Sequence, residues 1–296
     1  MKKIIILYIG IISFALNAQK IKLLDLPSFF EREFEISGLT GNENYLFLAA
    51  ERCEKIFIIK KDDMTHVETI QFNSKDIPNG IEIEGLCLFK DFLLLTDEKN
   101  GKIVSFNRNT EKLLALHPNG IDLSSFKGKY GIEGIAVDEK LKVLYVLREK
   151  NAKHQSEIHS FSISKKKDSL ILKYRNKTLV QHVDAKWRYT GLSMDYENNR
   201  LLCLKSYYLK NQPNLCKREI DYISIDSLSN KQTNPNMLLS LTKEIYRNRN
   251  SFATNIEGIY SDNESIFVTS DNGEGKKDCS QKSIKTILIK VQKHSD

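Results

Sequence analysis

The sequence predicts an all-β protein, a β-propeller in which five blades are favoured. The first observation is a recurring Ile-Glu-Gly followed by Ile or Leu, within IEIEGLCLF (81–89), KYGIEGIAVD (129–138) and TNIEGIYSD (254–262). The second is that ISGLTGNENYLFLAAE (36–51) and YTGLSMDYENNRLLCLK (189–205) align with these three on the Gly. The third is that an apolar strand, a polar turn and another apolar strand follow the Gly in every copy.

The repeat has the length of a propeller blade. The aligned glycines are 47, 49, 57 and 67 residues apart, and they are Gly38, Gly85, Gly134, Gly191 and Gly258. Units of roughly 40–50 residues with four antiparallel strands are typical of propellers. A Gly at the start of the innermost strand is expected because chains crowd near the axis and a side chain does not fit. Six blades stay the alternative, since the stretches before Gly191 and Gly258 have room for extra strands.

The remaining strands of each unit follow in order. The strand after the polar turn is strongly apolar, as in YLFLAA (45–50) and VLYVL (143–147). A third strand alternates apolar and polar residues, as in KIVSF (102–106), and this period of two indicates a half-buried antiparallel strand. A fourth strand is predicted in segments such as HVETIQF (66–72) and SLILKY (169–174).

The two ends of the chain are expected to complete one blade together. The last unit runs out after its third strand, near Val291, while KIKLLDL (20–26) is a strand without a unit of its own. We predict that this N-terminal strand completes the last blade and closes the ring, which leaves only short, protected edges. One short helical turn is expected in SLTKEIYRNRN (240–250).

Residues 1–18 have the form of a secretory signal peptide. Two lysines precede an apolar run over residues 4–16, and Ala18 offers a small residue for cleavage. The run is shorter than the roughly 20 residues of a membrane span; a retained membrane anchor is the alternative. We expect a single propeller domain over residues 19–296, exported to the periplasm or the extracellular space, with no membrane insertion after cleavage.

Charge and cysteine content exclude some classes of partner and site. The net charge of +7 is scattered over 296 residues, so no nucleic-acid partner is expected. The five cysteines form no C-x-x-C pair, which argues against a zinc ribbon or a thioredoxin-type site. Export permits a disulfide: Cys216 and Cys279, both in polar segments, are the expected pair, and Cys53 is the competing partner.

A ring of charged side chains is predicted at one mouth of the channel. The residue before each aligned Gly is polar, and the second apolar strand ends at a charged residue 12 to 14 residues after its Gly. Because that antiparallel strand returns to the end where the first strand began, the two sets should meet. The expected carboxylates are Glu84, Glu133, Glu257, Glu51, Asp97 and Asp271, and the expected cations are Arg148 and Lys205.

The predicted ring points to a metal site, with a structural role as the alternative. Like charges of this number cannot gather without a compensating partner, and calcium prefers six to eight such oxygen ligands. Calcium, or another divalent cation, is therefore the expected cofactor of the six carboxylates. Arg148 and Lys205 are expected to bind an anionic group of a small-molecule ligand. In the structural alternative, each Glu caps a strand turn or pairs with a cation of a neighbouring blade.

Common catalytic motifs are absent from the sequence. It contains no G-x-S-x-G elbow, no H-E-x-x-H pair and no P-loop, and none of its six histidines stands at a motif position. An enzyme built on this chain is therefore expected to use metal-bound water and carboxylates.

Residues 35–59, 81–106 and 130–151 resemble secreted β-propellers of the phytase-like esterase type and the related SdiA-regulated propellers. In both, (Ser/Glu)-Gly-(Leu/Ile) precedes a strand that ends in an acidic residue, and the resemblance covers about residues 35–292. It implies an exported propeller, calcium or another divalent ion in some members, and hydrolysis of phosphoesters or esters. The matching acidic positions are Glu84, Asp97, Glu133, Glu257 and Asp271. The departures are Ser37 and Thr190 at two anchors, and Arg148 and Lys205 at two strand ends.

Two functions are consistent with the sequence. The first is a divalent-metal-dependent phosphoester or ester hydrolase whose carboxylates hold the cation. The second is a non-catalytic propeller of the SdiA-regulated type that binds a small ligand, a glycan or an envelope protein. In that case the acids serve a structural ion or the registry of the blades.

Overall fold

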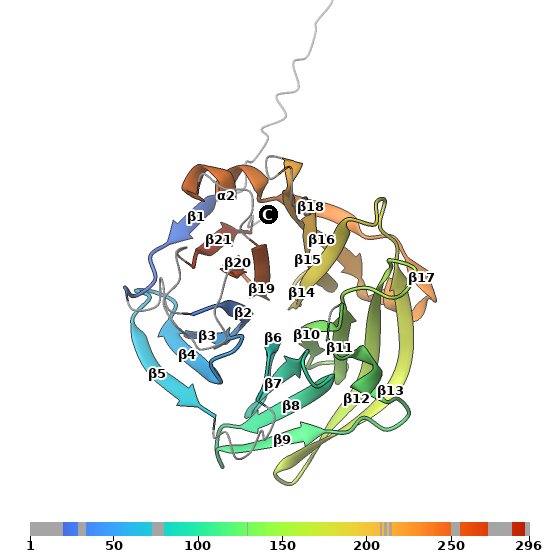
Figure 1. Cartoon of the computed structure of the whole chain (residues 1–296). Coiled ribbons are helices and arrows are strands. Elements are labelled where there is room, and N and C mark those ends of the chain that lie inside the picture. Colours follow the sequence, from blue (N-terminus) through green and yellow to red (C-terminus); the bar gives the residue numbers. More distant parts are fainter. Residues whose placement is uncertain are drawn as a thin grey trace, which may run out of the picture.

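The five Gly-anchored repeats form five sheets, which stand around a common axis as the blades of a propeller (Figure 1). The computed structural model describes residues 20–28, 34–72, 80–128, 130–207, 209, 212, 215–249, 255–271 and 286–293, with the backbone alone at 246–249 and 271. The predicted signal peptide, residues 1–18, lies outside these ranges. The all-β, five-bladed fold predicted from the repeat is confirmed.

The first three blades follow one another along the chain. Blade 1 comprises β2 (Ile36–Gly41), β3 (Tyr45–Ala50), β4 (Lys55–Lys60) and β5 (His66–Gln71). Blade 2 comprises β6 (Ile83–Phe89), β7 (Phe92–Asp97), β8 (Lys102–Asn107) and β9 (Lys112–Leu116). Blade 3 comprises β10 (Ile132–Asp138), β11 (Val143–Arg148), β12 (Ser156–Lys166) and β13 (Ser169–Val180), with the 3-10 helix η1 (Leu123–Phe126) before it.

The last two blades contain the irregular parts of the fold. Blade 4 comprises β14 (Trp187–Asp195), β15 (Arg200–Tyr207), β16 (Lys217–Ser224) and β18 (Asn236–Ser240). Blade 5 comprises β19 (Asn255–Ser261), β20 (Ser265–Asp271), β21 (Leu288–Gln292) and β1 (Ile21–Leu24). Between β16 and β18 lie the 3-10 helix η3 (Ile225–Ser229) and the two-residue β17 (Gln232–Thr233), which pairs in parallel with β13 at the edge of blade 3. The long stretch before Gly258 thus adds a fifth strand to blade 3.

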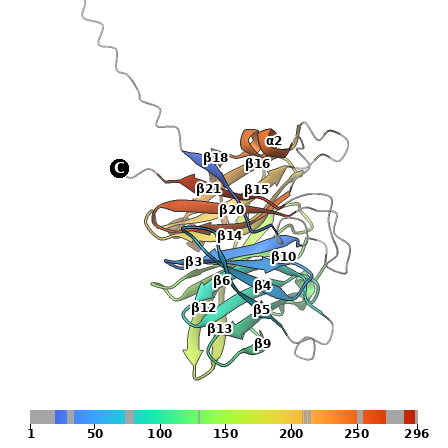
Figure 2. The same cartoon turned by 90° about the vertical axis from the view of Figure 1, so that its left-hand side faces the viewer.

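The N-terminal strand closes the ring. β1 pairs antiparallel with β21, from Ile21 opposite Val291 to Leu24 opposite Leu288, so the first and last described strands lie side by side in blade 5 (Figure 1). The closure predicted from the unmatched N-terminal strand is confirmed. Figure 2 shows the ring from the side, with α2 (Thr242–Arg249) at its outer edge.

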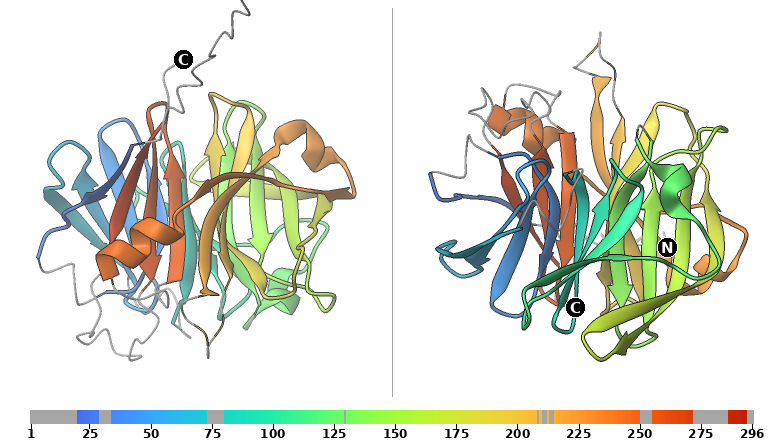
Figure 3. Two further views of the ribbon diagram at one scale, coloured as in Figure 1. Left: turned by 90° about the horizontal axis from the view of Figure 1, so that it is seen from above. Right: turned by 60° about the horizontal axis from the view of Figure 1, so that its bottom comes forward.

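Apolar side chains fill the spaces between neighbouring blades. Phe47 and Ala49 of β3 pack against blade 2, whereas Leu46 and Leu48 of the same strand pack against blade 5. Strands that are covered on both faces are hydrophobic throughout, which explains runs such as YLFLAA. Helix α2 adds Ile245 to the cluster between blades 4 and 5, on the outside of the ring (Figure 3). None of the helices in the described ranges has the length and hydrophobicity that a bilayer crossing requires.

The anchor glycines let the innermost strands approach one another. A Cβ on Gly85 would lie 2.7 Å from the carbonyl oxygen of Glu133, and one on Gly134 would lie 2.7 Å from the nitrogen of Leu192. No anchor glycine has a positive φ angle, so these positions require space for a neighbouring strand and no special backbone conformation. The crowding predicted near the axis is confirmed.

The cysteines correct the disulfide that the sequence favoured. Cys216 is a buried free thiol, as are Cys87 and Cys203, so the expected pairing of Cys216 with Cys279 is wrong. Cys53, the competing partner, is the disulfide-bonded residue; Cys279 lies outside the described residues. The segment around Cys216 looks polar in sequence, but the thiol turns inward and accepts a hydrogen bond from the backbone N–H of Leu209.

Candidate functional site

Every innermost strand carries a β-bulge at the residue before its anchor glycine. In each blade the register with the second strand shifts there. A bulge sets two residues opposite one and re-aims a side chain, and in this ring the re-aimed side chains meet. The hydroxyl of Ser37 donates to Oε2 of Glu257 at 2.9 Å, although 220 residues separate them. The five bulge residues are Ser37, Glu84, Glu133, Thr190 and Glu257.

Three of the predicted carboxylates form a tight group. Glu51, Glu84 and Glu257 each offer an oxygen, and these atoms lie within 4.8 Å of one another. All three residues are buried, and they come from blades 1, 2 and 5. Burial raises the pKa of Glu84 well above its usual value, and the nearby charges of Glu51 and Glu257 raise it further. The mutual repulsion of these carboxylates therefore favours the protonated form of Glu84.

Glu133 of blade 3 belongs to the same mouth. Burial raises its pKa well above the usual range, Glu149 and Glu257 add to the rise, and Arg188 opposes it. We call the end of the channel lined by Glu51, Glu84, Glu133 and Glu257 the acidic mouth.

The register of the second strands reveals a further set of residues at the acidic mouth. Five residues, one in each blade, pair with the residue before the bulge and are structurally equivalent: Ala50, Asp97, Arg148, Lys205 and Ser270. The next residue along the chain is Glu51, Glu98, Glu149, Ser206 or Asp271, according to the blade. Sequence reasoning identified Glu51 and Asp271 in this set and missed Glu98 and Glu149; the side chain of Asp271 lies outside the described part of the chain.

Glu98 carries the clearest sign of this environment. Its Oε1 accepts a hydrogen bond from the backbone N–H of Gly131 at 3.1 Å. Burial nevertheless raises the pKa of Glu98 to about 7, and the neighbouring charge of Glu149 contributes to the rise. A signal for Glu98 existed in the sequence, since it directly follows Asp97.

Asp97 itself holds a turn and does not join the group. Its side chain accepts hydrogen bonds from the Asn100 side chain at 2.7 Å and from the Asn100 backbone at 3.3 Å. The sequence alignment placed Asp97 level with Glu51, but the register makes it equivalent to Ala50. A shift of one residue turns a strand side chain to the other face, which is why the structure places Asp97 apart from Glu51, Glu84 and Glu257.

The side chains of Arg148 and Lys205 also point away from the carboxylates of the acidic mouth, because the register makes both residues equivalent to Ala50 and not to Glu51. The guanidinium of Arg148 lies 4.5 Å from the ring centroid of Phe126 and 3.3 Å from Oε2 of Glu157. The ammonium of Lys205 lies 3.0 Å from Oδ2 of Asp221 and 4.3 Å from the ring centroid of Trp187. Both cations therefore pair with acids other than Glu51, Glu84, Glu133 and Glu257.

Two other arginines supply positive charge there. Nη1 of Arg188 lies 3.2 Å from Oε1 of Glu149, and Nε of Arg52 lies 2.7 Å from Oε1 of Glu51. Burial lowers the pKa of Arg188, but the charges of Glu149, Glu133 and Glu257 outweigh it, so the net shift is upward. No repeated pattern points to Arg188, because it lies ahead of the bulge rather than at a position that recurs in each blade.

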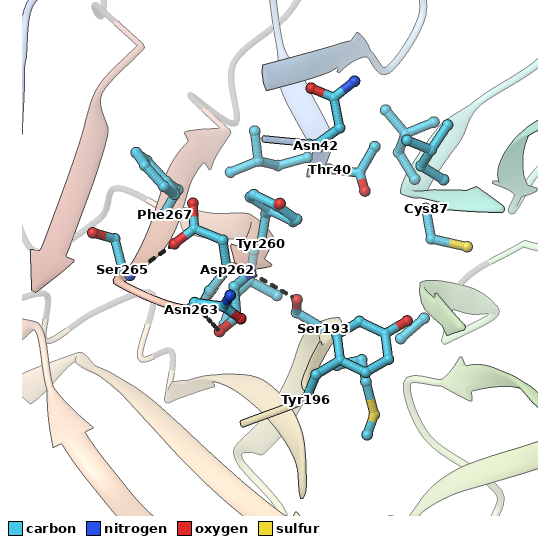
Figure 4. A pocket seen from close by; sticks show the side chains of 18 of the residues that line it. Thr40, Asn42, Cys87, Ser193, Tyr196, Tyr260, Asp262, Asn263, Ser265 and Phe267 are labelled. Carbon is cyan, nitrogen blue, oxygen red and sulfur yellow. Dashed lines mark hydrogen bonds between the residues drawn. The ribbon is translucent and has the colours of Figure 1, made fainter. Parts of the chain in front are cut away.

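The opposite mouth is a different kind of surface. A cavity of about 950 Å³ lies there, lined by the residues that follow the anchor glycines, among them Thr40, Cys87 and Ser193. Figure 4 shows Cys87 on one side of the cavity and Tyr260 and Asp262 on the other. The hydroxyl of Ser193 accepts a hydrogen bond from the backbone N–H of Ser261 at 2.9 Å. We call this end the open mouth.

The sequence profile of the SdiA-regulated family matches residues 33–207, which is more than half of the chain. The chain belongs to the SdiA-regulated family. The match spans blades 1 to 3 and the first two strands of blade 4, and with them Glu51, Glu84 and Glu133. No curated protein matches the chain.

Solved structures resemble this SdiA-regulated propeller in fold. The glutaminyl cyclase of Myxococcus xanthus superposes with a TM-score of 0.54 at 9% identity, over 93% of this chain and 98% of that one. A luciferin-regenerating enzyme superposes with a TM-score of 0.49 at 10% identity, over 94% and 96% of the two chains. At such identities the likeness concerns the fold alone.

Proposed function

We propose that this propeller binds a divalent cation at Glu51, Glu84 and Glu257, with calcium as the expected ion. The observation that carries the proposal is the approach of three buried carboxylates from three blades to within 4.8 Å. Every donor in the group is a hard oxygen, and such ligands suit calcium. Neighbouring groups hold the ligands in place, since Ser37 and the side-chain amide of Asn255 both donate to Glu257.

The reaction we propose at this mouth is hydrolysis of a small phosphoester or carboxylic ester. A bound divalent cation would polarise the ester and supply activated water. Burial raises the pKa of Glu133 well above its usual value, which favours the protonated form, and this carboxyl would donate its proton to a leaving oxygen. The positive charge of Arg188 would orient the anionic part of the substrate, in place of the residues that the sequence suggested.

Calcium-dependent melting tests the cation site. We expect excess calcium to raise the melting temperature relative to a chelator, and Glu84→Gln to abolish most of that rise. Glu157→Gln is the matched control, because Glu157 is equally buried but pairs with Arg148 and Lys177 away from the acids. The control should lose stability equally with and without calcium. An unchanged calcium response in Glu84→Gln would refute the site.

Release of phosphate or of an alcohol from generic esters then tests the reaction. Calcium-dependent turnover that Glu133→Gln lowers by about 100-fold or more is the expected result, given the usual contribution of a general acid. A calcium-dependent melting shift without turnover would favour the second function, a non-catalytic binding propeller with a structural ion. One observation supports that second function: Arg52 and Arg188 are already paired with acids of the mouth, as expected for blade registry.

We also propose that the chain is exported. The signal-like residues 1–18 suggest it, and the disulfide at Cys53 agrees with an oxidising compartment. Mass spectrometry of the secreted or periplasmic fraction should find a mature N-terminus close to residue 19; recovery of the intact N-terminus in the cytoplasm alone would contradict the proposal.

A further inference from the structure

Blade 4 interrupts the acidic mouth. Each of the other four blades places at least one Glu at the bulge or at the position after the second strand. Blade 4 places Thr190 and Ser206 there instead. Blade 4 therefore contributes no carboxylate at these two positions, which makes the mouth asymmetric. Arg188 of the same blade lies two residues before Thr190.

Three polar residues form a row across blade 4. Arg188 of β14 is directly opposite Ser206 of β15, and Ser206 is directly opposite Arg218 of β16. Residues that are directly opposite on neighbouring strands extend from the same face of a sheet. Leu204 lies two residues before Ser206, and Ile220 lies two residues after Arg218. Both belong to the apolar cluster that blade 4 shares with blade 5. Since side chains alternate along a strand, the row lies on the face of blade 4 that is turned to blade 5.

Two polar atoms of this row have no hydrogen-bond partner within the part of the chain that the structure describes. The hydroxyl of Ser206 is fully buried and makes no hydrogen bond there, and neither does Nε of Arg188. A buried polar group without a partner is unusual in a folded protein and calls for an explanation. Both atoms can donate, so an acceptor would satisfy both.

Arg218 adds a second guanidinium on the other side of Ser206. Its Nη1 donates to the carbonyl oxygens of Tyr207 and Lys217 at 2.9 and 2.8 Å, which fixes the side chain inside the protein. Burial, together with the charge of Arg188, lowers the pKa of Arg218 to about 10. Two like charges held next to a buried hydroxyl are the arrangement expected around an anion.

We propose that Arg188, Ser206 and Arg218 form an anion subsite that binds one phosphate or carboxylate group of the ligand. The inference rests on the proposed function in one respect, since it assigns the anionic end of that ligand to blade 4. Glu257 lies near both guanidiniums and opposes an anion while it is charged. A cation at Glu51, Glu84 and Glu257 neutralises it, so anion binding is stronger in calcium.

Binding of inorganic phosphate, and of acetate in a parallel arm, tests the subsite by calorimetry on the full chain. We expect Ser206→Ala to weaken binding at least tenfold in calcium and to leave the melting temperature without ligand unchanged or higher. Ser265→Ala is the matched control: Ser265 is also a buried hydroxyl without a partner among the described residues, but it lines the open mouth. Tighter binding of phosphate than of acetate would assign the group to a phosphoester, and the reverse to a carboxylate.

A second variant and a second readout keep the two proposals separate. Arg188→Lys retains a charge but loses Nε, so phosphate binding should weaken while the calcium-dependent melting shift persists. If calcium gives no shift but Ser206→Ala still abolishes phosphate binding, the cation site fails and the subsite stands. If wild-type protein binds neither anion, or if Ser206→Ala and Ser265→Ala bind as wild type does, the subsite is wrong.

Discussion

The two ends of the same five innermost strands differ more than any two blades do. At the acidic mouth the bulges bring carboxylates from separate blades together in a buried group. At the open mouth the same strands surround a cavity lined by side chains such as Thr40, Cys87 and Ser193. The backbone pattern is shared, so the difference comes from the bulges, which re-aim side chains at one end only. Local irregularities of a regular repeat thus give the two ends of the ring different side-chain chemistry.

The largest difference between the mouths should be seen when an ion pair is broken. Arg188→Met leaves the buried Glu149 without its ion-pair partner, which should cost about 3–5 kcal/mol. Lys61→Met removes the partner of Asp262, a pair of 2.6 Å at the partly exposed rim of the open mouth, and should cost about 1 kcal/mol or less. Urea unfolding of both variants measures the two values, and equal costs would remove the contrast between the ends.

An intermediate effect on stability is expected at the anchor glycines, which lie between the bulge residues of the acidic mouth and the residues that line the open mouth. Gly85→Ala would set a methyl group 2.7 Å from the carbonyl oxygen of Glu133 and 3.0 Å from the nitrogen of Ile135. Backbone atoms of a neighbouring blade must shift, at a cost of about 1–3 kcal/mol. The melting temperature should fall equally in calcium and in chelator, unlike that of the adjacent Glu84→Gln. A variant as stable as wild type would show that the strands have room to separate.

The smallest effect is a pH dependence that belongs to the acidic mouth. The pKa of Glu98 is raised from 4.5 to about 7, so the folded state binds more protons than the unfolded state between these values. The stability that Glu98 contributes is therefore fully present below about pH 4.5 and is lost as the pH rises through about 7. Because Glu98 is only partly buried, solvent screening reduces this linkage, and the free energy of unfolding should fall by about 1 kcal/mol or less in total between these two values.

Melting curves between about pH 5 and about pH 8 in chelator should show this decrease, and calcium should reduce it. Glu98→Gln keeps the hydrogen bond from Gly131 but cannot ionise, so its profile should be flatter than that of wild type. A profile identical to that of wild type would mean that Glu98 does not titrate in this range.

The fold was predictable because its signals repeat. Five aligned glycines, alternating third strands and an unmatched strand at residues 20–26 together specify the blades and the closure of the ring. The bulge residues Glu84, Glu133 and Glu257 were predictable for the same reason, since each precedes an anchor glycine.

The rest of the mouth was not predictable, because it depends on register. A strand end that is one residue longer or shorter turns the charge to the opposite face, and the sequence does not show where pairing stops. The structure sets Asp97, Arg148 and Lys205 apart from the carboxylates of the acidic mouth in this way, and Glu98 and Glu149 were missed. Arg188 and Arg218 occur once rather than in each repeat, so no periodic signal identifies them.

The pairing of β1 with β21 has a consequence for how the chain acquires its structure. During synthesis β1 is the first described strand to leave the ribosome and β21 is the last, yet each needs the other. Blades 1 to 4 can form as they emerge, whereas blade 5 waits for the end of translation. Contacts this distant in sequence form slowly. A chain truncated before β21 therefore leaves β1 without its partner and cannot close the ring.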